Sequence, residues 1–205
     1  AFKNGEYDIM IGTQMVSKGL NFPKVTLVGI LNADLSLFSE DFRSFEKTFS
    51  LITQTIGRAG RGEKAGRAII ETLSPDIAVL DYCKTGDYEG FYEEEIKFRK
   101  NGLYPPFCNL VCVKFKNTDE QGAIDDSGKF LRFLAKTAET RFGELPIRIL
   151  GAAPSLPYKK ASSYYMQILI KCRADKNFLE LLNAACENYY KEKNLSSLII
   201  DMFYN

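Results

Sequence analysis

Two near-continuous apolar runs constrain the fold of this chain most. They span residues 7–11 (YDIMI) and 25–31 (VTLVGIL), and a short third run follows at residues 68–71 (AIIE). Strands of a parallel sheet are covered on both faces and therefore read as continuous apolar runs. Between the second and third runs, apolar residues recur from Phe42 to Ile56 at steps of three and four, which predicts a helix. We therefore expect an α/β arrangement, part of a doubly wound parallel sheet, at residues 1–86.

The end of this expected helix carries the stretch from Gln54 to Gly62 (QTIGRAGRG), where Arg58 and Arg61 stand among three glycines. Glycine lets a backbone approach a ligand closely, and the planar guanidinium fork suits phosphate oxygens. Two interpretations are open. The stretch is either a phosphate-sensing element or a helix C-terminal cap, in which glycine favours the αL conformation and cations complement the helix dipole.

Composition excludes several classes of site. The chain has 205 residues, is 45% hydrophobic and has a formal net charge of +1, so it suits one or two domains and bulk charge indicates no partner. It contains no histidine, and its five cysteines form no Cys-x-x-Cys pair, so we predict no metal site and no Ser-His or Cys-His nucleophile. The odd number of cysteines without a disulfide framework indicates a reducing compartment. Without a signal peptide or a membrane-length apolar run, we expect a cytoplasmic protein with no membrane partner.

Charge is distributed unevenly. Residues 146–174 contain no acidic side chain, while basic residues and tyrosines are interleaved there, namely Arg148, Tyr158, Lys159, Lys160, Tyr164, Tyr165, Lys171 and Arg173. Basic side chains can contact phosphates and aromatic rings can stack on bases, so this pattern predicts a DNA surface with Lys159, Lys160 and Tyr164 as leading candidates. The alternative is a solvated β-hairpin whose tyrosines pack on the core.

A second domain is expected after a charged helix at residues 88–100. Pro105 and Pro106 mark a join, so residues 87–106 are interpreted as a linker helix and join. Beyond it the pattern predicts a strand at 108–116, a helix at 118–142 opened by a Thr118–Gln121 capping box, strands at 147–151 and 164–172, a helix capped by Asp175, and a strand at 196–203. This β-α-β-β-α-β order predicts a ferredoxin-like α+β domain at residues 107–205.

Four short segments resemble a known family by their order and spacing. They are GTQM at residues 12–15, KG at 18–19, DFR at 41–43 and GRAGR at 57–61. Together they resemble the fifth and sixth motifs of superfamily 2 helicases, and in particular the PriA-like replication-restart helicases, from about residue 5 to residue 72 and more weakly to the C-terminus. The resemblance implies a C-terminal fragment, with part of the second RecA-like helicase lobe followed by the C-terminal domain.

The resemblance also implies roles for individual residues. Helicases of this superfamily bind ATP, with Mg, between two RecA-like lobes, and the arginines of the sixth motif reach the γ-phosphate as arginine fingers. Carried onto this sequence, the catalytic residues are Arg58 and Arg61, the nucleotide-binding residues are Gln54, Gly57, Gly19 and Asn21, and the residues at the nucleic-acid backbone are Gly12, Thr13 and Gln14, with Lys18 between the two roles. Asn21 and Asn32 depart from the family pattern, because acidic residues are expected at these two positions. Asp34 and Arg43 match the family, and either bridge the motifs or form local ion pairs.

Two features of the family are missing from this sequence. It contains no Gly-x-x-x-x-Gly-Lys-[Ser/Thr] loop, so the fragment alone lacks the cradle for the inner phosphates and is expected to be inactive. The zinc-binding cysteines that the family carries before the fifth motif are also missing; zinc is expected in the full-length family but not in this fragment. Both observations lead us to expect an N-terminal truncation.

The resulting expectation is the C-terminal part of an ATP-dependent 3′-to-5′ DNA helicase that acts in replication restart at stalled forks. By family resemblance its partners are DNA, as branched forks and single strands, primosome or helicase-loading proteins, and single-stranded-DNA-binding protein. Two alternatives remain. One is a non-enzymatic DNA- or protein-binding module with a degenerate helicase lobe, and the other is a nucleotide-binding regulator whose arginines complete a partner's active site.

Overall fold

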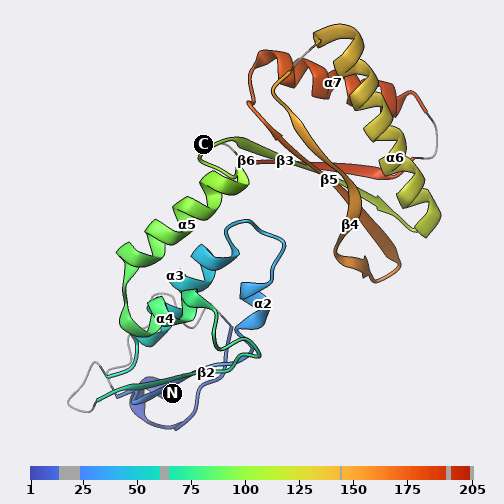
Figure 1. Cartoon of the computed structure of the whole chain (residues 1–205). Coiled ribbons are helices and arrows are strands. Elements are labelled where there is room, and N and C mark those ends of the chain that lie inside the picture. The colour runs from blue at the N-terminus through green and yellow to red at the C-terminus, as the bar shows by residue number, and fades with distance from the viewer. Residues whose placement is uncertain (14–23, 61–64, 144, 193–194, 204–205) are drawn as a thin grey trace. The chain divides into compact units, whose positions relative to one another are not determined.

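The computed structural model describes residues 1–13, 24–60, 65–143, 145–192 and 195–203. The chain divides into two compact units, residues 1–96 and 97–205 (Figure 1). The division falls within helix α5 (Tyr88–Gly102), which occupies most of the stretch interpreted as a linker. None of the helices in the described ranges is long and apolar enough to cross a membrane.

The first unit is built on a parallel pair of strands. Its elements are η1 (Phe2–Asn4), β1 (Leu27–Ile30), α2 (Asp34–Leu37), α3 (Ser44–Ile56), β2 (Arg67–Ile70), α4 (Ala78–Thr85) and the first part of α5. Strand β1 pairs in parallel with β2, with Leu27 opposite Arg67 and Ile30 opposite Ile70. The parallel pairing predicted for the second and third apolar runs is confirmed.

Helix α3 places the predicted apolar residues into a small core. Phe49 and Ile52 are buried on α3, and Val79, Leu80 and Cys83 of α4 join them. The ring of Phe49 also stacks on Phe91 of α5, with ring centroids 4.5 Å apart. This packing fixes α3, and with it the start of the glycine–arginine stretch at its C-terminal end, against α4 and α5.

The strand predicted at residues 7–11 is wrong. These residues form neither a helix nor a strand, and Ile9 and Ile11 are 79% and 87% exposed. An apolar run becomes a strand only where neighbouring strands take up its backbone hydrogen bonds and cover its side chains. In the described part of the chain the parallel sheet consists of β1 and β2, so the run at 7–11 has no position in it.

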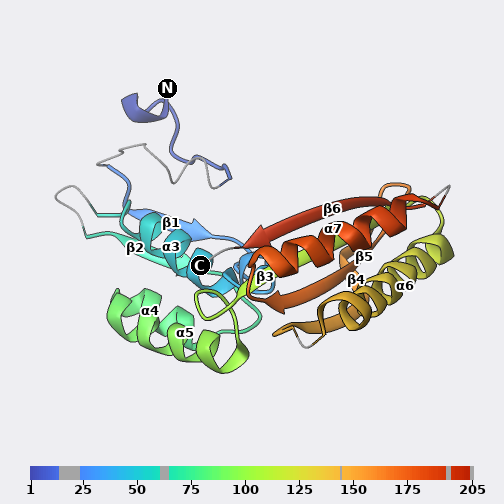
Figure 2. The ribbon, with the colours of Figure 1, turned by 90° about the horizontal axis from the view of Figure 1, so that it is seen from above.

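In its described residues, the second unit contains the last part of α5 and a four-stranded sheet with helices packed on it. Its elements are β3 (Asn109–Asn117), α6 (Glu120–Thr137), a π-helical turn η2 (Ala138–Phe142), β4 (Arg148–Lys160), β5 (Ser163–Cys172), α7 (Lys176–Tyr190) and β6 (Ser197–Phe203). The strand order is β4-β5-β3-β6 and all neighbours are antiparallel. The predicted order of elements is therefore confirmed. Figures 1 and 2 show α6 and α7 on the same face of the sheet.

Alternation along the central strands builds the core between sheet and helices. Val111, Val113 and Phe115 of β3 are fully buried, and so are Ile168 and Ile170 of β5. Three aromatic rings close one end of this core, since Phe115, Phe130 and Tyr189 lie edge to face with centroids 5.5–6.0 Å apart. Side chains at the intervening positions of β3 and β5 lie on the opposite face, which neither helix covers.

The start of α6 differs from the prediction. The cap is Asp119, whose carboxylate accepts a hydrogen bond from the Gly122 N–H at 2.7 Å, and the helix begins at Glu120. The side-chain oxygen of Asn117 accepts from the Asp119 N–H at 3.0 Å and shapes the turn that ends β3. This local bond places Asp119, rather than Thr118, at the N-cap position. The strand predicted at 147–151 begins at Arg148 but extends to Lys160.

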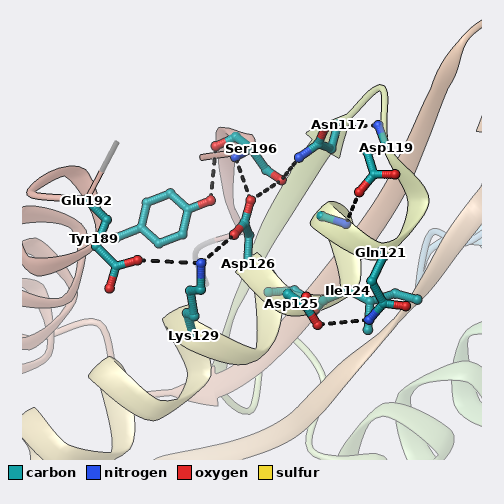
Figure 3. A network of polar contacts seen from close by, with 12 residues as sticks. Asn117, Asp119, Gln121, Ile124, Asp125, Asp126, Lys129, Tyr189, Glu192 and Ser196 are labelled. Atoms are coloured by element: carbon teal, nitrogen blue, oxygen red, sulfur yellow. Dashed lines mark hydrogen bonds and ion pairs between the residues drawn. The ribbon is translucent and has the colours of Figure 1, made fainter. Parts of the chain in front are cut away.

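A buried polar network joins α6, α7 and the start of β6 (Figure 3). The Asp126 carboxylate accepts hydrogen bonds from the N–H and the hydroxyl of Ser196, both at 2.9 Å. It also pairs with Lys129 at 3.2 Å, and Lys129 lies 3.5 Å from Glu192. The Tyr189 hydroxyl donates to the Ser196 carbonyl at 3.0 Å. Because the side chain of Asp126 is only 6% exposed, these partners offset the cost of burying its charge.

Candidate nucleotide and nucleic-acid sites

The glycine–arginine stretch begins where the backbone of α3 tightens. The Gly57 N–H donates to Thr53, the Arg58 N–H to Thr55 and the Ala59 N–H to Ile56, each at 3.0 Å. Bonds of the last two kinds, three residues apart, are a common way to satisfy the carbonyls of a helix end. Gly57 has φ −63°, an ordinary helical value. The helix is thus closed by its own backbone, without a residue in the αL conformation at position 57.

Gly60 and Gly66 lie in close backbone contact. Gly60 has φ +71°, and a Cβ atom there would lie 2.5 Å from the Gly66 nitrogen. A Cβ on Gly66 would lie 2.4 Å from the Gly60 nitrogen. The Gly60 N–H also donates to the Val25 carbonyl at 3.0 Å, beside the start of β1. No side chain fits at either position, so the two glycines are required by a close backbone contact.

The sixth-motif residues that the structure describes lie together at this helix end. Gln54 is exposed on the last turn of α3, and its amide nitrogen donates to the Ser50 hydroxyl at 3.0 Å. Gly57 is exposed, and Arg58 is partly buried one residue after it. Residues three and four apart at a helix end are neighbours, so Gln54, Gly57 and Arg58 form one group. Arg61 lies outside the described residues.

The fifth-motif residues are described only in part. Gly12 and Thr13 are exposed and belong to no helix or strand. Four further predicted residues of this motif lie outside the described residues, namely Gln14, Lys18, Gly19 and Asn21. The predicted contacts of these residues with nucleotide or DNA therefore stay predictions.

The loops that follow β1 and β2 are hydrogen-bonded to each other. Asn32 has φ +52°, and its N–H donates to the Glu71 carboxylate at 3.1 Å. Asp34 accepts from the Thr72 hydroxyl at 3.0 Å and from the Leu73 N–H at 2.9 Å. The carboxyl ends of parallel strands are where α/β proteins bind ligands. Asp34 therefore has a structural role at this edge, because it holds one loop against the next.

Arg43 forms a local ion pair ahead of α3. Its guanidinium donates two hydrogen bonds to the Asp41 carboxylate, each at 3.0 Å, and its N–H donates a third at 2.9 Å. Lys47 contacts the same carboxylate. Partial burial acts to raise the pKa of Asp41, but the bonds from Arg43 and Lys47 hold that pKa well below its usual range. Of the two interpretations of Arg43, the local ion pair is therefore confirmed, and its partner is the acid two residues earlier in the DFR segment.

The predicted DNA residues lie in the β4–β5 hairpin. Lys159 and Lys160 are exposed. The Lys159 ammonium donates to the Tyr164 hydroxyl at 2.9 Å and lies 4.7 Å from the centre of that ring. Tyr164 and Tyr158 are partly buried against the core, with ring centroids 5.7 Å apart. The hairpin thus presents its lysines to solvent, while these two tyrosines serve mainly in packing.

The cysteines show the properties of packed thiols. Burial raises the pKa of Cys83 to about 11 and that of Cys172 to about 12, so both are protonated at neutral pH. Within the described ranges, no group of three or more histidine, cysteine, aspartate or glutamate side chains is placed to hold a metal ion.

Two family models match the chain. The helicase conserved C-terminal domain matches residues 1–63, and the primosomal protein N C-terminal domain matches residues 100–202, just over half of the chain. Among solved structures, the de novo designed protein Foldit4 aligns with 47% of this chain and 97% of its own length at 8% identity and a TM-score of 0.35.

Relatives that share the name replication restart protein PriA match this chain over most of its length. The replication restart protein PriA of Bacillus subtilis (strain 168) is 39% identical over 207 residues, which cover 100% of this chain and 25% of the relative. The protein of that name from Borreliella burgdorferi is 34% identical and covers 99% of this chain and 30% of the relative. The protein of that name from Rickettsia felis is 38% identical, and the match covers 86% of this chain and 26% of the relative. This chain spans about a quarter of the length of these relatives. Because the model of the primosomal protein N C-terminal domain matches just over half of the chain, the chain belongs to the PriA family.

Proposed function

We propose that this chain is the C-terminal part of an ATP-dependent 3′-to-5′ DNA helicase that acts in replication restart. The relatives carry the name replication restart protein, and a helicase domain model matches the first 63 residues. The observation that carries the proposal is the group formed by Gln54, Gly57 and Arg58 at the end of α3, next to the close contact of Gly60 and Gly66.

The proposal includes two finer points of fold. Residues 1–86 are proposed to be part of a RecA-like lobe, which the parallel pairing of β1 and β2 with helices between them supports. Residues 107–205 are proposed to be a ferredoxin-like domain, supported by the order β-α-β-β-α-β and the strand order β4-β5-β3-β6.

The donors at the end of α3 fit the terminal phosphate of a nucleotide. Arg58 is permanently charged and Gln54 offers a neutral amide, both suited to phosphate oxygens. None of Gln54, Gly57 and Arg58 has a carboxylate that could hold Mg²⁺. We therefore propose that the first lobe of the parent protein supplies the metal ligands and the Walker loop. Bound ATP with Mg²⁺ supplies the phosphoryl group that is transferred to water. Arg58 and Arg61 would stabilise the negative charge that spreads over this group, in the manner of arginine fingers.

DNA, as branched forks and single strands, is the proposed nucleic-acid partner. The exposed lysines of the β4–β5 hairpin support this proposal, because Lys159 and Lys160 place two neighbouring cations at the end of β4. Primosome or helicase-loading proteins and single-stranded-DNA-binding protein are proposed as protein partners, on the family membership alone.

The chain by itself should not hydrolyse ATP. Positioning and charge stabilisation both need the phosphate cradle, and the sequence contains no such loop. In a phosphate-release assay, the purified chain should give the rate of buffer alone with or without DNA, while the intact parent protein turns ATP over. DNA-stimulated turnover by the chain that Arg61→Ala abolishes would contradict the proposed division of the site.

Replacing both hairpin lysines should weaken DNA binding in a salt-dependent way. Each lost phosphate contact reduces the slope of log K against log salt by about 0.9 on duplex DNA, so Lys159→Ala/Lys160→Ala should lower it by roughly 2. The measurement is a salt titration of the intact parent on forked DNA. A matched control is Lys176→Ala/Lys191→Ala, two exposed lysines at the ends of α7. Equal slopes for the hairpin variant and the wild type would show that the hairpin lysines are only solvated.

A further inference from the structure

The sheet face that α6 and α7 leave uncovered carries an unusual set of side chains. On β3 and β5 the residues that alternate with the core positions lie on this face, and the pairing register places Lys116 beside Tyr165 and Lys114 beside Gln167. On the flanking strands, Ile199 lies next to Lys114, and Lys160 pairs with Ser163, two residues before Tyr165. We call these exposed or partly exposed residues the open-face patch: Lys114, Lys116, Lys160, Tyr165, Gln167 and Ile199.

The charged side chains of this face are mostly basic. The four strands together contain a single acidic residue, Asp201 of β6. Asp201 lies 3.6 Å from Lys114, and both side chains are substantially exposed, at 45% and 38%. An exposed pair of this kind contributes little and leaves both groups available to solvent. Lys116 and Lys160 lie at the same end of the face as Tyr165, so this end is positively charged around an aromatic ring.

The other end of the face is covered by the unit's own chain. Lys171 is buried, its ammonium donates to the Gly102 carbonyl, and it lies 3.8 Å from the centre of the Tyr104 ring. Leu110, opposite Lys171 on β3, is 4% exposed. The available surface is therefore the half of the sheet that contains Tyr165 and the three lysines, not the half that contains Lys171.

The dimensions of this half suit a single strand of nucleic acid. Side chains on one face of a strand recur about every 7 Å, and neighbouring strands lie about 5 Å apart. Lys116 is directly opposite Tyr165, and Lys114 and Lys160 lie one such step to either side, so a base stacked on Tyr165 has cations on both sides for its flanking phosphates. A four-stranded sheet whose central strands present aromatic and basic residues is a known platform for unstacked bases. A duplex keeps its bases inside and offers none to stack on Tyr165.

We propose that the open-face patch binds single-stranded DNA, with a base stacked on Tyr165 and phosphates on Lys114, Lys116 and Lys160. This inference rests on the proposed function as a DNA helicase. It goes beyond the hairpin lysines, because Tyr165, Lys114 and Lys116 lie on the uncovered sheet face, whereas Tyr164 packs against the core.

The test is equilibrium binding of the 205-residue chain to a fluorescein-labelled thymidine oligonucleotide of about 20 nucleotides and to a duplex of the same length. Tyr165→Leu should weaken single-strand binding about tenfold or more, and Tyr165→Phe should retain it, because stacking requires the ring and not the hydroxyl. Lys114→Ala/Lys116→Ala should lower the salt slope by roughly 1.4, since each phosphate contact contributes about 0.7 on a single strand. Tyr190→Leu and Lys176→Ala/Lys191→Ala, on the helical side, are the matched controls and should bind as the wild type does.

The possible outcomes separate this inference from the proposed function. Unchanged single-strand binding by the Tyr165 and Lys114/Lys116 variants, with loss in Lys159→Ala, would overturn the open-face patch and keep the hairpin as the DNA contact. Equal losses on single strand and duplex would overturn the assignment to single strands. No binding by the wild-type chain would overturn the inference, while ATP turnover by the parent still tests the helicase proposal. If Tyr165→Leu unfolds, photocrosslinking of the wild-type chain to an iodouracil-containing oligonucleotide decides, because the crosslinked peptide must contain Tyr165.

Discussion

Alanine at Arg58 or Arg61 in the intact parent protein is expected to slow DNA-stimulated ATP hydrolysis by about 10³- to 10⁵-fold. An arginine that reaches the transferred phosphoryl group acts when charge spreads over that group, so its loss lowers the turnover rate far more than nucleotide affinity. The measurement is steady-state ATP turnover beside equilibrium nucleotide binding for the same proteins.

The structure separates this prediction from a capping role. Helix α3 is closed by backbone hydrogen bonds from Gly57, Arg58 and Ala59, which an alanine at position 58 retains. A lost cap would cost only about 1 kcal/mol of stability and leave chemistry intact. Each alanine variant should therefore melt near the wild-type temperature and bind forked DNA nearly as well. Normal turnover in a destabilised variant would mean that the stretch is only a helix end.

Lysine is the informative second substitution at both positions. It keeps the positive charge but loses the planar fork that donates two parallel hydrogen bonds. Arg58→Lys and Arg61→Lys should therefore recover only a small part of the lost turnover. Arg67→Lys, at the exposed start of β2, is a matched control that should turn over ATP at the wild-type rate.

Removing the Asp126 carboxylate is expected to destabilise the second unit strongly. Asp126→Ala would leave the buried Ser196 N–H and hydroxyl without this acceptor and take away the nearer partner of Lys129. Hydrogen bonds to a buried charge contribute about 1.5–3 kcal/mol each, and breaking a buried pair costs more than the pair contributes. The free energy of unfolding should fall by about 3 kcal/mol or more, measured by urea unfolding of the chain.

The neighbouring acid provides the control for this prediction. Asp125 is exposed and accepts one hydrogen bond, from Gln121 at 2.9 Å (Figure 3). Asp125→Ala should change the free energy of unfolding by less than about 0.5 kcal/mol. Asp126→Asn keeps the shape and one acceptor oxygen, so it should lie between the two. Similar stability of the Asp125 and Asp126 alanine variants would show that the network contributes little.

The second unit could be predicted closely because its signals are local and agree with one another. Asp175 precedes an apolar helical pattern, and its carboxylate indeed accepts from the Phe178 N–H at 3.0 Å. The strands predicted at 108–116 and 164–172 agree with β3 and β5 to within one residue at each end. The order of the elements then restricted the sheet to few topologies.

Contacts between distant residues could not be predicted in the same way. Asp126 occupies a helix position that a local pattern assigns to a solvated face, and its main partner, Ser196, is 70 residues away. The start of α6 moved by one residue because Asn117 bonds to the Asp119 backbone. The apolar run at 7–11 predicted a strand that does not form. Apolar residues indicate a preference for burial, but they do not show whether a neighbouring strand is present.

The candidate site was predictable in its residue types and not in its geometry. Arginine and glycine next to a helix left two interpretations open, a phosphate-sensing element or a helix cap, and the described residues Gln54, Gly57 and Arg58 do lie at one helix end. The contact of Gly60 with Gly66 depends on β2 returning beside β1, so no local pattern could reveal that both glycines are sterically required.

ATP-dependent unwinding by the intact parent protein is the direct test of the proposed helicase. The substrate is a duplex with a single-stranded 3′ tail, compared with the same duplex carrying a 5′ tail, and strand separation is followed with and without ATP for the wild type and for Arg61→Ala. We expect that the wild type separates the 3′-tailed substrate only when ATP is present, and that Arg61→Ala binds this substrate but leaves it paired. Binding without unwinding by the wild type, or unwinding by Arg61→Ala at the wild-type rate, would contradict this expectation.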